Sequence, residues 1–216
     1  MTRSARQSLT ERRADELRLE IALAARDLFV ADGDTSATVE RICEIVGIAP
    51  RTFHRHFPVK EDVIIPLLRS FGEVSLEVLK YSSPDADPIE TLVHAFTTEV
   101  AERHVEEFDR KFMTLIVKDP QYRLRWLDWG DDLCEPITEF LARHFDLGED
   151  PFVRTLPAHL ILDTGRQVYI RWVDSGDFAE LEASHRAGMR MVLSGLRRRE
   201  YALHRHSEIK SEPVSQ

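Results

Sequence analysis

The stretch RICEIVGIAPRTFHRHFPVKED, residues 41–62, decides the fold expected for the front of this chain. Gly47 can close one helix because glycine adopts left-handed backbone conformations, and Pro50, three residues later, suits the first turn of another. Pro58 ends that second helix, since a proline disfavours helical conformation in the residue before it. The stretch therefore predicts two helices joined by a tight turn.

The second of these helices, residues 50–57, has two different faces. On an ideal helix of about 100° per residue, Arg51 and Arg55 lie together, whereas Phe53 and Phe57 lie on the opposite side. One face can thus donate hydrogen bonds while the other packs. This is the helix-turn-helix pattern, in which the second helix enters the DNA major groove and arginine can donate two parallel hydrogen bonds to guanine.

A longer helix precedes this pair. Leu17, Ile21, Ala24 and Leu28 recur at helical spacing and predict a helix over about residues 10–31. A hydroxyl residue, Thr38, stands where it can cap the middle helix.

In this order the segment TSATVERICEIVGIAPRTFHRHFPVKEDVI, residues 35–64, resembles the DNA-binding segment of the tetracycline-repressor (TetR) family of bacterial regulators. The preceding IALAARDLFVADG, residues 21–33, looks like the first helix of that family. The resemblance covers about residues 10–65. Two positions depart from the family pattern: Ala49 stands where Ser or Thr usually caps the recognition helix, and His54 stands where Tyr is common.

The resemblance implies a three-helix DNA-binding domain over residues 10–60. A larger helical domain over 61–203 would bind a small effector and dimerise through its last two long helices. Residues 204–216 are polar and are expected to be a disordered tail. The positions that match the family's DNA contacts, together with Arg55 on the same face, are Thr38, Arg51, Thr52, His54, Arg55, His56 and Lys60.

Helical periodicity also dominates the rest of the chain, so the predicted fold class is all-α. We expect helices near residues 60–82, 88–105, 106–118, 120–145, 152–174 and 178–200. Pro136 predicts a kink or a split in the helix of residues 120–145. Pro66 should kink the helix of residues 60–82 unless it falls in the first turn; such a kink is either a hinge between the domains or a static bend.

Charge and cysteine content limit the cellular compartment and the binding partners expected for the protein. The net charge is -9, but residues 1–62 carry ten Lys/Arg and eleven Asp/Glu, so the acidity lies in the remaining chain. Cys43 and Cys134 form no CxxC pair, which argues against disulfides and zinc and fits a reducing cytoplasm. No apolar run approaches the roughly 20 residues of a membrane span. We therefore expect a cytoplasmic protein without a membrane partner, metal or cofactor.

Two groups of residues are candidates for an effector site. Tyr122, Trp126 and Trp129 form an aromatic stripe, which is either plain core or the wall of an effector pocket. Asp163 and Gln167 lie on an apolar row of residues 152–174 and need partners if they are buried. Those partners are intrachain groups, a second subunit or a ligand.

The last two helices also carry candidate dimer contacts. A helix that is apolar on two sides is either a central core helix or packs against a second copy of the chain. We assign these residues to a four-helix dimer interface: Ile161, Gly165, Val168, Trp172, Leu181, His185, Gly188, Val192 and Leu196.

The sequence shows no HExxH, GxSxG, P-loop or dinucleotide-binding glycine pattern, so we predict no catalytic residues and no enzyme. The predicted function is a ligand-responsive regulator that binds a palindromic operator as a homodimer and is released by a small apolar or aromatic effector. The alternative is a helical binding protein whose helix-turn-helix segment serves a protein partner.

Overall fold

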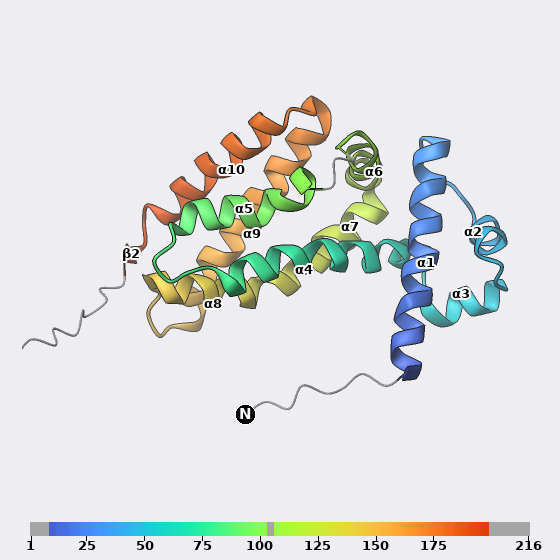
Figure 1. The fold of residues 1–216 in the computed structure, drawn as a ribbon, viewed down its shortest axis with the longest axis horizontal. Coiled ribbons are helices and arrows are strands. Elements are labelled where there is room, and N and C mark those ends of the chain that lie inside the picture. Colours follow the sequence, from blue (N-terminus) through green and yellow to red (C-terminus); the bar gives the residue numbers. More distant parts are fainter. Residues whose placement is uncertain (1–8, 103–105, 199–216) are drawn as a thin grey trace, which may run out of the picture.

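The structure is a computed structural model that describes residues 9–102 and 106–198 (Figure 1). Within these residues the chain is all-α, as predicted. The expected tail of residues 204–216 lies outside the described residues. The α-helices are α1 (Leu9–Asp32), α2 (Val39–Val46), α3 (Pro50–His56), α4 (Ile65–Tyr81), α5 (Pro88–Glu102), α6 (Glu106–Lys118), α7 (Pro120–Gly130), α8 (Cys134–His144), α9 (Pro151–Ser175) and α10 (Phe178–Leu193).

The front of the chain forms as the local sequence signals predict. The Thr38 hydroxyl accepts a hydrogen bond from the backbone N–H of Arg41 at the start of α2. Gly47 ends α2 in the left-handed conformation, with φ 74°, and its N–H bonds back to Cys43. Helix α3 begins at Pro50 without a side-chain cap, as the alanine before it implies.

Three predicted helices differ in extent from those in the structure. The predicted helix of residues 60–82 begins as a 3₁₀ segment, η1 (Lys60–Ile64), so Pro66 falls in the first turn of α4. The predicted helix of residues 120–145 is divided by a second 3₁₀ segment, η2 (Asp131–Leu133), and not at Pro136, which lies in the first turn of α8. Helix α10 ends at Leu193, because the chain then turns into a two-residue strand.

That strand, β2 (Arg197–Arg198), pairs antiparallel with β1 (Phe145–Asp146) after α8. Figure 1 shows α1 to α3 at one end of the molecule and the β1–β2 pair at the other. Helix α4 runs from the first end into the helical body, where α9 and α10 lie side by side. No helix among the described residues is long and apolar enough to cross a bilayer.

Two hydrophobic clusters fill the interior. We call α1 to α3, which hold the expected helix-turn-helix, the recognition unit, and the first cluster the proximal cluster because it includes their side chains. Its largest fully buried members include Ile21, Phe29, Ile42, Phe53, Ile64, Leu68, Phe112, Ile116 and Tyr122. The distal cluster lies at the other end and includes Leu79, Leu92, Leu133, Ile137, Phe140, Leu141, Ile161, Leu162 and Met189. The proximal cluster crosses residue 60, so side chains of α1 to α3 share one core with α4, α6, α7 and α9.

Candidate nucleic-acid interface and an internal cavity

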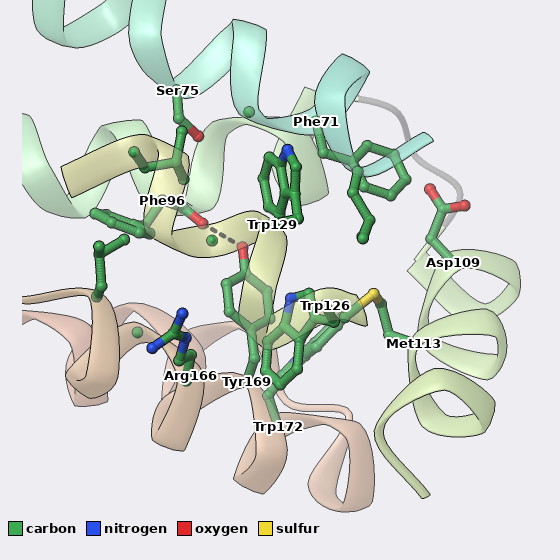
Figure 2. Close-up of a pocket in the computed structure, with 16 residues that line it drawn as sticks. Phe71, Ser75, Phe96, Asp109, Met113, Trp126, Trp129, Arg166, Tyr169 and Trp172 are labelled. Atoms are coloured by element: carbon green, nitrogen blue, oxygen red, sulfur yellow. Dashed lines mark hydrogen bonds between the residues drawn. The ribbon is translucent and has the colours of Figure 1, made fainter. Parts of the chain in front are cut away.

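A cavity of about 130 Å³ lies where the two clusters meet (Figure 2). Trp129 lines this cavity and packs against both clusters. The cavity walls come from α4 to α7, η2 and α9. The lining residues are Leu68, Phe71, Gly72, Ser75, Phe96, Asp109, Met113, Trp126, Trp129, Gly130, Leu133, Leu162, Gly165, Arg166, Tyr169 and Trp172.

Aromatic rings dominate these walls. All three tryptophans of the chain line the cavity, together with Phe71, Phe96 and Tyr169. Gly72 lets α4 approach the indole of Trp129, because a Cβ at residue 72 would lie 2.6 Å from the indole Cζ2. Such a cavity suits an apolar or aromatic molecule, as most small-ligand sites do.

Two of the hydroxyls in the wall already have backbone partners. Ser75 Oγ donates to the carbonyl of Ala95 at 2.7 Å. The Tyr169 hydroxyl donates to the carbonyl of Phe96. These bonds tie α4 and α9 to α5, so the two hydroxyls hold the wall together and their protons are not available to a ligand.

The predicted ligand residues divide into three groups. Trp126 and Trp129 line the cavity as expected. Tyr122 is fully buried in the proximal cluster, edge-on to Phe29 at 5.4 Å between ring centroids, and does not reach the cavity. Asp163 and Gln167 are exposed on α9 and lie outside the cavity lining. The placement of these last three residues corrects the prediction.

Most of the predicted dimer contacts lie inside the protomer itself. Six of the nine are buried within the single chain: Ile161, Gly165, Val168, Trp172, Leu181 and His185. Gly165 and Trp172 line the cavity. This corrects the prediction, because side chains that fill the protomer's own core cannot also face a second copy.

The remaining three predicted contacts also have partners within the chain. Gly188 lets α10 approach α9 closely, since a Cβ at residue 188 would lie 2.2 Å from Thr164 Cγ2. Val192 and Leu196 are partly buried against the distal cluster, and Leu196 lies beyond the end of α10. A different row of α9 remains exposed, and its large apolar members are Phe152, Val153, Leu156 and Leu160.

The recognition helix α3 presents the two faces that its sequence predicts. Phe53 is fully buried, Phe57 is 3% exposed, and their ring centroids lie 5.2 Å apart. Arg51, His54 and Arg55 are exposed, and Thr52 is partly exposed. The aromatic side therefore anchors α3 to the core and leaves its donors facing outward.

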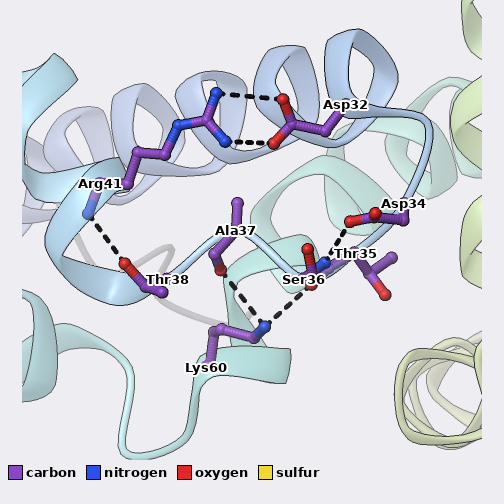
Figure 3. A network of polar contacts seen from close by, with 8 residues as sticks. All are labelled: Asp32, Asp34, Thr35, Ser36, Ala37, Thr38, Arg41 and Lys60. Atoms are coloured by element: carbon purple, nitrogen blue, oxygen red, sulfur yellow. Dashed lines mark hydrogen bonds and ion pairs between the residues drawn. The ribbon is translucent and has the colours of Figure 1, made fainter.

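Polar contacts fix the loop between α1 and α2 against η1 (Figure 3). Arg41 forms a bidentate ion pair with Asp32 at the end of α1. The ammonium group of Lys60 donates to the carbonyls of Thr35 at 2.9 Å and Ala37 at 3.3 Å. Lys60 therefore tethers the loop to η1 with the same ammonium group that is predicted to contact DNA.

His56 also differs from its predicted role. Both ring nitrogens are buried and have no hydrogen-bond partner among the described residues. Burial lowers the pKa of His56, and the charges of Arg18 and Arg55 lower it further. The ring is therefore a neutral packing group and not an exposed donor. On an ideal helix His56 lies about 60° from Phe53, and this closeness to the aromatic face was the signal that could have revealed its burial.

Comparisons with known proteins agree with this geometry. Residues 21–65 match the family described as bacterial regulatory proteins, tetR family. The chain is similar to the HTH-type transcriptional repressor AcnR of Corynebacterium diphtheriae, with 30% identity over 170 residues, which cover 76% of this chain and 85% of AcnR. This chain belongs to the TetR family.

The other similarities agree with membership of the TetR family. The HTH-type transcriptional regulator TcmR of Streptomyces glaucescens is 28% identical over 184 residues, which cover 81% of this chain and 80% of TcmR. The fold is shared with Salmonella enterica GusR, at TM-score 0.56 and 19% identity over 83% of this chain and 96% of GusR. It is also shared with SmeT in a complex with triclosan, at TM-score 0.58 and 15% identity over 93% of this chain and all of SmeT. This TetR-family chain is thus a DNA-binding transcriptional regulator whose recognition helix is α3.

Proposed function

We propose that the protein is a homodimeric repressor that binds a palindromic operator and leaves it when a small apolar or aromatic effector fills the cavity. The exposed donors of α3, opposite buried phenylalanines, are the observation that carries the DNA-binding part. Arg51 and Arg55 suit base edges or phosphates, and Thr52 suits either. Among known relatives, AcnR is described as a repressor.

A dimer is part of the proposal because one short helix reaches only a few base pairs. Two copies would present two recognition helices to half-sites roughly 34–36 Å apart. The exposed apolar row of α9, Phe152, Val153, Leu156 and Leu160, is the surface we assign to the partner copy. Met191 of α10 is a further exposed large apolar residue, at 74% exposure.

Two elements connect the cavity to the recognition unit. Helix α4 contributes Leu68, Phe71, Gly72 and Ser75 to the cavity wall and follows η1 directly. Helix α7 contributes Trp126 and Trp129, and its N-cap Asp119 and Arg125 make polar contacts to the loop after α1 and to η1. A ligand that separates α4 from α7 would therefore change the support of α1 to α3.

The polar bonds at the start of α7 are specific. Asp119 caps α7 and accepts a hydrogen bond from the Thr35 hydroxyl at 2.6 Å. Burial alone would raise the pKa of Asp119, but the bonds from Thr35 and from the first-turn amides of α7 lower it overall. Arg125 forms an ion pair with Asp62 of η1 at 2.9 Å. Asp119 and Arg125 thus hold α7 against the loop after α1 and against η1.

An effector can act only by preferring one of two arrangements of these contacts. A ligand with equal affinity for the DNA-binding and released states would change nothing, however tightly it bound. The proposal therefore requires that effector and operator weaken each other's binding by the same factor.

The test is a DNA-protection experiment on sequence next to the gene, followed by binding measurements over a range of salt concentrations. We expect a protected palindrome and an affinity that falls steeply with salt, because phosphate neutralisation releases counterions. Changing Arg51 and Arg55 to Ala should lower affinity by roughly five- to 150-fold for each lost base contact.

Arg171→Ala is the matched control, because Arg171 is exposed on α9 and pairs with Glu180 far from α3. It should bind the operator as the unchanged protein does. Absence of any protected site would refute binding to an operator next to the gene, and equal affinity of the double variant would refute the assignment of Arg51 and Arg55 to DNA contacts. Binding to a protein instead would favour the alternative function.

A further inference from the structure

Arg166 is the cationic group among the described residues that line the cavity. It projects from α9 toward the end of α7, where one terminal nitrogen, Nη2, donates to the carbonyl of Leu127 and to Asp131 Oδ1, at 2.8 Å in the second case. The side chain of Arg166 is 19% exposed, whereas that of Asp131 is 63% exposed. The cation is therefore enclosed, while its counter-charge is mostly in water.

Some N–H groups of the same guanidinium make no hydrogen bond to the described residues. Arginine carries five N–H groups, and both recorded bonds use Nη2. Nε and Nη1 have no recorded hydrogen-bond partner in the described part of the chain. Gly130 lets the group lie flat across the end of α7, because a Cβ there would lie 3.0 Å from Nη2 and 3.5 Å from Nε. Arg166 is thus held in place through Nη2 and keeps separate N–H donors on Nε and on Nη1.

The other polar residues of the cavity wall limit which ligand groups can bind to the free N–H groups of Arg166. The hydroxyls of Ser75 and Tyr169 donate to backbone carbonyls. Asp109, the other charged residue of the lining, lies on the opposite side of the aromatic rings from Arg166 (Figure 2). An acceptor that enters beside Arg166 therefore meets a cation without a neighbouring carboxylate in the cavity.

We propose that the effector is a small aromatic acid, whose ring lies among Trp126, Trp129 and Trp172 and whose carboxylate or phenolate accepts hydrogen bonds from Arg166. This inference rests on the proposed function, in which the cavity is the effector site. A hydrogen bond from a free guanidinium N–H to a carboxylate or phenolate is charge-assisted, and such bonds are roughly twice as strong as neutral ones.

Size narrows the class further. A cavity of about 130 Å³ is small beside the roughly 300–1,000 Å³ of typical ligand sites. A single substituted ring therefore suits this cavity better than a fused-ring acid.

The chain provides its own optical readout, because its three tryptophans all line the cavity. We would titrate the full-length protein with 4-methylbenzoate, the uncharged 4-methylbenzamide and the non-aromatic 4-methylcyclohexanecarboxylate. Tryptophan fluorescence and calorimetry should both report binding of the benzoate. Its affinity should exceed that of the amide, which lacks the charge, and that of the cyclohexane acid, which lacks the aromatic ring, by about tenfold or more.

Three variants test whether Arg166 causes the preference for the benzoate over the amide. Arg166→Met should abolish the advantage of the benzoate over the amide. Asp131→Asn should strengthen benzoate binding a few-fold and leave amide binding unchanged, because it removes the exposed counter-charge of Arg166. Arg171→Met on the same helix should change neither ligand.

The outcomes separate this inference from the proposed function. Equal affinities of the benzoate and the amide for the unchanged protein, or a preference that survives in Arg166→Met, would overturn the aromatic-acid inference. Absence of binding by every probe would overturn it as well. Operator binding by the same preparation tests the proposed function independently, so a failure of either idea is visible without the other.

Discussion

The proximal and distal clusters share α4, α9 and α10 but differ in what else they connect. The proximal cluster runs from Phe53 of the recognition helix to Trp172 of the cavity wall. The distal cluster joins the far halves of α4 and α9 to α5, α8 and α10 and contains no side chain from α1 to α3. Side chains of α1 to α3 therefore share one core with part of the cavity wall, whereas Leu133 and Leu162 of the distal cluster form another part.

The largest expected effect comes from opening the proximal cluster at α3. Phe53→Ala should lower the free energy of unfolding by about 3–5 kcal/mol, since it removes a fully buried ring. Leu141→Ala, at an equally buried position of the distal cluster, should cost about 2–5 kcal/mol. Denaturant unfolding gives both values.

Operator affinity should distinguish Phe53→Ala from Leu141→Ala. At a temperature where both variants are folded, Phe53→Ala should weaken operator binding because the donors of α3 lose their anchor. Leu141→Ala should bind as the unchanged protein does. Equal losses of DNA affinity in the two variants would remove the distinction between the clusters.

The next effect is expected at the contact between the clusters. Gly72→Ala should destabilise the protein by about 1–3 kcal/mol, because its Cβ would overlap the Trp129 indole. Trp129 should move, so the tryptophan fluorescence spectrum should change as well. Gly195→Ala is the control, since nothing lies within 4 Å of its Cβ position. A neutral Gly72→Ala would mean that α4 and α7 already separate easily.

His185 gives an effect of similar size that depends on pH. Its Nδ1 lies 2.9 Å from the Leu181 carbonyl and must donate, while burial lowers the pKa of His185 from near 6.5 to about 4. Between those values the unfolded chain binds the extra proton, so stability is present above about pH 6.5 and is lost as pH falls toward 4.

Unfolding at two pH values tests this. The unchanged protein should lose about 2 kcal/mol more than His185→Leu between about pH 7 and about pH 5. Parallel losses in the two proteins would show that His185 does not titrate between the helices. The comparison within each protein cancels any packing change that the substitution itself causes.

The smallest effect is expected where α7 meets the loop after α1. Thr35→Val should cost about 1 kcal/mol, because it removes one part-buried hydrogen bond to Asp119. Thr155→Val, which loses only a bond within the exposed first turns of α9, is the control. If Thr35→Val also reduces the coupling between effector and operator, α7 takes part in the response; unchanged coupling would leave that role to α4.

Local signals explain why the recognition unit could be predicted. Gly47, Pro50 and the capping residue Thr38 each act on their immediate neighbours, so the sequence alone fixes the ends of α2 and α3. The roles of Lys60 and His56 could not be read in this way. Their partners and neighbours come from η1, the loop after α1 and α1 itself, which meet only in the folded chain.

Helix α9 shows the limit of periodicity. Both of its apolar rows satisfy a helical repeat, and periodicity does not say which row faces the protomer's own core. The polar residues Asp163 and Gln167 marked the exposed row, while Gly165 marked a close contact with Phe96 inside the chain. Arg166 and Asp109 escaped prediction because they meet the tryptophans only through the packing of four helices.

The pairing of β2 with β1 has a practical consequence. It returns the chain after α10 to the end of the molecule farthest from α3 (Figure 1). A fusion partner or an immobilisation tag added after Arg198 would be attached far from α3. Protein anchored through that end to a sensor chip should still capture duplexes from solution, whereas anchoring through α1 would crowd the surface being measured.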